Sequence, residues 1–165
     1  MNSCNCSENT IANRFMKNGN KHRIDESKLQ TVLYDLRFFP GGATGVDEKN
    51  NKLIAETVCR LPPEVQERII NELVFVGIDG VHGQFEIFGF NSDYKDRLIP
   101  MILLNFSSMR RKSKKYKMTV IAHEIAHFFL RHEDMIGGKE IEIAADDLCE
   151  KWGFGRSYDN YDMFK

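Results

Sequence analysis

The most constraining feature of the 165-residue sequence is a pair of histidines, His123 and His127, in the pattern H-E-x-x-H. In an α-helix, residues four apart lie on one face, so the two imidazoles can be directed at one point. Glu124 lies about 100° around the helix from His123, where its carboxylate can reach a water at that point without being a ligand. Apolar residues at helical spacing surround the motif, and no glycine or proline interrupts it. The pattern therefore predicts a buried helix that carries two metal ligands.

A second pair of polar residues, Glu142 and Asp146, has the same spacing on the next predicted helix, which begins after Gly138 and ends before Gly153. Glu142 would complete a set of two histidines and one glutamate, which leaves a fourth position open, as in catalytic zinc sites. Asp146 would accept the outer ring N–H of a ligating histidine and so fix its tautomer. The apolar stripe beside this pair consists of Ile141, Ala145, Leu148 and Trp152.

The identity of the third ligand has alternatives. Glu140 lies on a different face of the same helix, and Glu133 and Asp134 lie in the loop that precedes it. A ligand set made of histidines alone fails on spacing, because His132 falls one residue short of the position that a third histidine would need.

With these residues the sequence resembles the zincin metallopeptidases, specifically the gluzincin branch with its HExxH…ExxxD arrangement. His123, Glu124 and His127 match the first motif, and Glu142 and Asp146 match the second. The compact layout and the run that joins the second pair are most similar to the small ImmA/IrrE-type peptidases.

The resemblance covers about residues 62–155. It implies a zinc-dependent metalloendopeptidase that hydrolyses peptide bonds of a protein substrate, with Glu124 as the catalytic general base acting on a zinc-activated water. A transcription regulator is among the expected protein partners. The alternative that the resemblance carries is a zinc-stabilised protein-interaction module, a regulator partner with little or no peptidase activity.

We expect an α+β fold: a minimal zincin-like domain in which a three-stranded sheet packs against the HExxH helix and the following glutamate-bearing helix. Apolar periodicity predicts helices at about 25–39, 48–60 and 61–73 and strands at 74–78, 84–90 and 99–106. Residues 79–83 are interpreted as a hairpin connection between the first two strands, and 91–97 as a longer turn to the third.

The third predicted strand leads toward the HExxH helix. Pro100 near its start favours an edge strand, which could pair with extended substrate backbone. The alternative is a buried core strand.

The domain organisation follows from composition along the chain. Residues 1–24 are polar and are interpreted as a tail, and residues 25–165 as a single domain with a helical N-terminal part (25–60) and a catalytic core (62–155). Four residues could donate hydrogen bonds to an oxyanion, one shortly after His127 and three near the end of the chain, but each is more readily interpreted as a surface residue and none is assigned to the catalytic set. They are Arg156, Tyr158, Tyr161 and His132.

The net charge of −1 gives no overall attraction to nucleic acid or to anionic membranes. The basic run at 110–117 is interpreted as a solvated loop, with nucleic-acid binding as the less favoured alternative. The sequence has no apolar run long enough to span a membrane and no secretory signal at its start, so we expect a cytoplasmic protein without membrane partners.

Four cysteines are present, and none is predicted to form a disulfide. Cys59 and Cys149 fall within helical patterns and are expected to be small buried residues. Cys4 and Cys6 are expected to be a reduced pair in the N-terminal tail, and metal binding or blockage of the zinc is the alternative.

Overall fold

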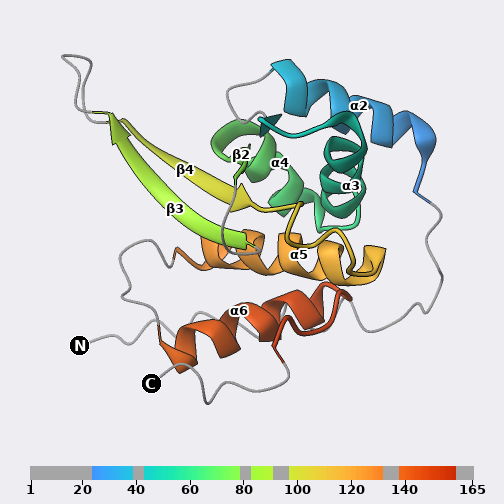
Figure 1. Cartoon of the computed structure of the whole chain (residues 1–165). Coiled ribbons are helices and arrows are strands. Elements are labelled where there is room, and N and C mark those ends of the chain that lie inside the picture. The colour runs from blue at the N-terminus through green and yellow to red at the C-terminus, as the bar shows by residue number, and fades with distance from the viewer. Residues whose placement is uncertain (1–23, 39–42, 79–82, 91–96, 132–137, 159–165) are drawn as a thin grey trace, which may run out of the picture.

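The computed structural model describes residues 24–38, 43–78, 83–90, 97–131 and 138–158. Within these residues the chain forms five helices and four strands, so the fold is mixed α and β, as expected (Figure 1). The helices are α2 (Glu26–Phe38), α3 (Glu48–Val58), α4 (Pro63–Glu72), α5 (Lys114–Leu130) and α6 (Lys139–Lys151), and the strands are β1 (Ala43–Thr44), β2 (Val74–Gly77), β3 (Gly83–Phe90) and β4 (Arg97–Leu104).

The first three helices begin and end within two residues of their predicted positions. Local chemistry explains two of the starts. Asp47 caps α3 by accepting a hydrogen bond from the backbone N–H of Asn50. Pro63 occupies the first turn of α4, where a backbone N–H has no helical partner in any case.

The sheet has four strands in the order β1-β2-β4-β3, so the expected three-stranded sheet is not confirmed. Strands β1, β2 and β4 are parallel, and β3 runs antiparallel to β4. The added strand, β1, contains two residues and pairs with β2. So short a strand leaves no periodic pattern in the sequence, which is why it was not predicted.

The predicted hairpin between β2 and β3 is wrong, because β4 lies between these two strands. The chain leaves β2, forms β3 at the edge and returns through β4 in the centre. The inner position of β4 is reflected in its burial, because Ile102 and Leu104 are fully buried.

The edge position predicted for the strand that contains Pro100 is therefore also wrong. Pro100 pairs with Ile87 of β3, whereas the pairing with β2 begins only at Met101. Pro100 therefore pairs with one neighbouring strand only, like a residue of an edge strand, where proline is tolerated. The edge strand next to β4 is β3.

Helix α5 lies across the sheet and contacts both the sheet and two other helices. It packs against β3 and β4, against α3 and against α6, which lies alongside it (Figure 1). Helix α2 packs on α3 and on α4 at the other end of the molecule (Figure 1). One hydrophobic cluster connects these helices with β2, β4 and α5. In the part of the chain that the structure describes, no helix is long and apolar enough to cross a membrane.

Candidate metal centre

Helix α5 carries the H-E-x-x-H motif in its most protected part. Ser113 caps the helix start by accepting a hydrogen bond from the N–H of Tyr116, and residues 118–128 are all buried. The helix ends at Arg131, whose left-handed backbone (φ 58°) lets its N–H bond back to the last turn. A helix buried on all sides has little freedom to move, so both histidines are held by the packing of the core.

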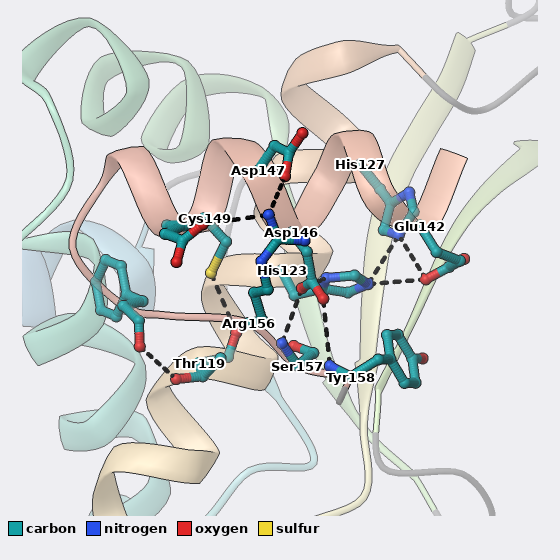
Figure 2. A network of polar contacts seen from close by, with 12 residues as sticks. Thr119, His123, His127, Glu142, Asp146, Asp147, Cys149, Arg156, Ser157 and Tyr158 are labelled. Atoms are coloured by element: carbon teal, nitrogen blue, oxygen red, sulfur yellow. Dashed lines mark hydrogen bonds and ion pairs between the residues drawn. The ribbon is translucent and has the colours of Figure 1, made fainter. Parts of the chain in front are cut away.

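The predicted ligand residues converge on one point. The Nε2 atoms of His123 and His127 lie 3.0 Å apart. An oxygen of Glu142, Oε2, lies 3.0 Å from Nε2 of His123 and 3.5 Å from Nε2 of His127 (Figure 2). One ligand atom from each of the three residues therefore falls in a single cluster, which can bind a metal ion.

The spacing of these atoms fits a metal ion. Ligands at about 2.0–2.1 Å from a tetrahedral ion lie about 3.3 Å from one another. The three separations of 3.0, 3.0 and 3.5 Å bracket that value. Nitrogen and carboxylate oxygen are also the donor types that a catalytic site with an open position uses.

Asp146 links the centre to the rest of the fold. This fully buried carboxylate lies 2.7 Å from Nδ1 of His123, on the ring side away from the cluster. Because a carboxylate accepts the proton of Nδ1, the lone pair of Nε2 is directed at the ligand cluster. Asp146 also accepts hydrogen bonds from the backbone N–H groups of Ser157 and Tyr158. Its predicted orienting role is thus consistent with the geometry.

The electrostatics of the centre reflect the close pairing of imidazole and carboxylate. Burial by itself lowers the pKa of His123, but hydrogen bonds to Asp146 and Glu142 outweigh this effect and raise its pKa to about 9. Burial by itself raises the pKa of Glu142, but hydrogen bonds to His123 and His127 dominate and lower its pKa to about 2. The carboxylate is therefore ionised at neutral pH, as a metal ligand must be.

Glu124 is 7% exposed and lies against the start of β3. A Cβ atom placed on Gly83 would lie 2.9 Å from Oε1 of Glu124 and 2.9 Å from Cγ1 of Val120. Real side chains essentially never make so short a contact, so this approach of strand to helix requires glycine at position 83.

The chain returns to the centre after α6 through residues 154–158, which we name the C-terminal strap. The buried side chain of Phe154 anchors it, and the carbonyl of Phe154 accepts a hydrogen bond from Thr119 Oγ1 of α5 (2.9 Å). Its end brings the Tyr158 ring to 5.4 Å from the ring of His123, edge to face (Figure 2). Burial raises the pKa of Tyr158, and the negative charges of Glu142 and Glu124 raise it further. The phenol therefore stays protonated at neutral pH.

The other sequence candidates divide into two groups. Glu140 is exposed on α6 and is not part of the ligand cluster, and Arg156 pairs with Asp147 and Glu150. The remaining candidates lie outside the described residues: Glu133, Asp134, His132, Tyr161, Cys4 and Cys6.

The two cysteines that the structure describes are not bonded to each other or to another cysteine of that part. Cys149 is buried and Cys59 is partly buried. Burial raises the pKa of both thiols, and that of Cys149 to about 12.

Two features of the centre, the close approach of β3 to α5 at Gly83 and the C-terminal strap, were not predicted from the sequence. Gly83 was interpreted only as the end of a connection, although a glycine at a strand boundary can also signal the close approach of another element. The strap was missed because its contacts, such as that of Thr119 with Phe154, join residues far apart in the sequence. No periodic pattern reports such contacts.

No protein-family model, curated protein or solved structure matches this chain significantly. The function must therefore be inferred from the side chains of the centre and from their spacing.

Proposed function

We propose that this protein is a zinc-dependent metallopeptidase built on a minimal zincin-like domain. The observation that carries the proposal is the convergence of His123, His127 and Glu142 within 3.0–3.5 Å, with Glu124 on the same buried helix. A purely structural zinc site is normally closed by four protein ligands and needs no neighbouring base. Here three ligands and a carboxylate beside them match the requirements of hydrolysis.

Zinc at the centre would polarise the scissile carbonyl and lower the pKa of a water at the open position to about 7. Glu124 would accept the proton of the water that attacks the scissile carbonyl carbon. When the C–N bond breaks, Glu124 delivers that proton to the departing amine nitrogen. Asp146 holds the tautomer of His123 throughout, because its hydrogen bond to Nδ1 keeps Nε2 available as a ligand.

The sheet supports a peptide as the substrate. Within the described residues, strand β3 pairs with β4 alone, and it begins at Gly83, directly beside Glu124. An extended peptide can add to the free edge of such a strand through backbone hydrogen bonds. This arrangement moves the substrate-pairing role from β4, for which it was expected, to β3. A protein substrate, with transcription regulators as the first class to examine, remains our proposal.

The substitution Glu124→Gln tests the assignment. The amide keeps the size of the side chain but cannot accept the proton, so we expect about one zinc per chain and a loss of hydrolysis of about 10²–10⁴-fold. Hydrolysis is followed with fluorescently labelled casein and a mixture of fluorogenic peptides. Glu140→Gln, on the exposed face of α6, is the matched control and should leave both zinc and hydrolysis unchanged.

Two outcomes would change the proposal. Undiminished hydrolysis by the zinc-loaded Glu124→Gln variant would contradict the role of Glu124. Wild-type protein that binds zinc but hydrolyses no substrate would favour the zinc-stabilised interaction module.

A further inference from the structure

A run of basic residues at 110–117 lies between β4 and the part of α5 that carries the histidines (Figure 1). We name these residues the basic platform. Six of the eight are lysine or arginine and none is acidic. Because the whole chain has a net charge of −1 and the platform contributes +6, the rest of the chain carries −7. The platform is therefore a strongly positive segment of an otherwise acidic chain.

The fold holds the backbone of the platform in place. Before it, the side chain of Asn105 accepts a hydrogen bond from the N–H of Ser108 (2.8 Å), and Met109 is fully buried. Within it, the N–H of Lys112 donates to the carbonyl of Met109 (2.9 Å), and Ser113 caps α5. The platform is thus a folded turn that continues into the first turn of a helix, rather than the loop expected from the sequence. A binding partner has little backbone freedom to restrict there.

The charges of the platform face solvent. The side chains of residues 110–115 are all exposed. Within the described part of the chain, the one ion pair of the platform joins Lys114 to Glu56 of α3. Lys112 lies over the ring of Tyr116, with its Nζ 5.0 Å from the ring centre. Five of the six charges therefore have no acidic partner among the described residues.

Local stability does not account for these charges. Each of the other described helices has an acidic residue in its first turn, where the helix dipole favours negative charge. Helix α5 has none there and begins with Lys114 and Lys115. Like charges at the positive end of a helix dipole destabilise the helix slightly. Such a departure from a local rule is expected where the residues bind a partner.

We propose that the basic platform is a docking surface for a short acidic segment of the protein substrate. This inference rests on the proposed peptidase function and names a substrate class for it: proteins with a run of glutamate and aspartate near the cleavage site. A short segment fits the platform better than a nucleic acid does. A nucleic acid extends beyond the eight residues and meets the net negative charge of the remaining chain.

Helix geometry sets the distance between the two sites. Lys117 and His123 lie on the same helix, about 9 Å apart along its axis. An extended peptide advances about 3.3 Å per residue, so at least about three residues separate the acidic segment from the scissile bond. Because residues 118–128 are buried, the peptide must pass over the surface instead of along the helix. We therefore expect a separation of about four to eight residues.

Binding is tested without turnover, through the fluorescence anisotropy of labelled hexaglutamate titrated with the purified protein. Wild type should bind it, and binding should weaken as the salt concentration rises from about 0.05 to about 0.5 M. The double variant Arg110→Gln, Arg111→Gln should weaken binding about fivefold or more, with zinc content and thermal unfolding unchanged. The matched control is Arg131→Gln, Lys139→Gln, which changes the charge equally at two exposed positions, the end of α5 and the start of α6. It should leave binding unchanged.

A second measurement connects the platform to hydrolysis. Two fluorogenic peptides share one cleavable sequence, followed after a spacer of about four residues by a block of glutamates or a block of glutamines. Wild type should hydrolyse the glutamate peptide with a KM lower by about fivefold and an equal kcat, because docking lies outside the reacting centre. In Arg110→Gln, Arg111→Gln the two peptides should have the same KM.

Each outcome supports or overturns a defined part of the inference. Wild-type protein that does not bind hexaglutamate at low salt, or an equal weakening in both double variants, would overturn the platform and leave the peptidase proposal standing. Tighter binding of an oligothymidylate with the same number of negative charges, lost in Arg110→Gln, Arg111→Gln, would overturn the choice of a protein segment. Zinc-loaded wild type that binds hexaglutamate but hydrolyses neither peptide would contradict the peptidase function and the substrate role, and would assign the platform to an interaction module.

Discussion

Helices α5 and α6 both contribute a pair of residues four apart to the centre, but the fold holds them differently. In α5 every residue from 118 to 128 is buried, between the sheet, α3 and α6. In α6 only Ala145, Asp146 and Cys149 are buried, and Glu142 is partly exposed in its first turn. The two histidines are thus positioned by packing, whereas the carboxylate ligand depends on a polar anchor one turn further along.

Within α6, Asp146 and Glu142 have different roles. Asp146 accepts hydrogen bonds from three donors in two other parts of the chain, α5 and the C-terminal strap, and therefore contributes to folding as well as to the centre. Glu142 contacts the two histidines alone among the interactions that we describe. The contacts of Asp146 thus stabilise the fold, whereas Glu142 contributes mainly to the proposed metal centre.

The largest expected effect separates these two roles. Asp146→Ala should lower the free energy of unfolding of the metal-free protein by about 3 kcal/mol, because buried donors lose their acceptor, and should weaken zinc binding about 10–100-fold. Glu142→Ala should lower that free energy less, because Glu142 is partly exposed, and should weaken zinc binding more than Asp146→Ala does. Urea unfolding after chelation and a competition titration for zinc measure the two quantities. Equal losses of stability and of zinc affinity in the two variants would contradict the difference between Asp146 and Glu142.

The pairing between the helices predicts a pH dependence of the chelated protein. The pKa of His123 is raised from 6.5 to about 9, so its contribution is fully present below pH 6.5 and is lost as the pH rises through 9. The pKa of Glu142 is lowered from 4.5 to about 2, so its contribution is present above pH 4.5 and is lost as the pH falls through 2. Urea unfolding should therefore show a loss of a few kcal/mol between pH 6.5 and 9. The same measurement on His123→Gln should show no such loss, and a persistent loss there would place its origin elsewhere.

A smaller effect tests the packing around α5. Gly83→Ala places a methyl group within 2.9 Å of both Glu124 and Val120, so helix and strand must move apart and the base is displaced. We expect zinc binding to remain and hydrolysis of labelled casein to fall about 10–100-fold, since small displacements at a reacting centre have effects of that size. Gly138→Ala is the control, because the nearest atom to a Cβ there is 3.8 Å away. Equal activity of the two variants would show that Glu124 does not depend on Gly83.

Much of this centre could be predicted from the sequence because its ligands follow helical spacing. His123 and His127, like Glu142 and Asp146, are each one turn apart, and a regular helix converts that spacing directly into a shared face. The carboxylate partner of a ligating histidine follows from the chemistry of imidazole. These predictions needed only local geometry.

The order of the strands could not be predicted in the same way. Pro100 indicated an edge, and the short connection before Gly83 indicated a hairpin, but both signals are local. The order of the strands depends on pairing between segments far apart in the sequence: β4 lies between β2 and β3, and its Ile102 and Leu104 are fully buried. The position of Tyr158 likewise depends on long-range contacts of the strap.

The central claim is that His123, His127 and Glu142 form a zinc centre, and the most direct test is the metal content of the purified protein by elemental mass spectrometry, beside His123→Ala and Glu142→Ala. We predict about one zinc per wild-type chain, as one site with three protein ligands requires, and loss or strong weakening of binding in both variants. Wild-type protein without zinc after reconstitution, or variants that retain it fully, would contradict the account.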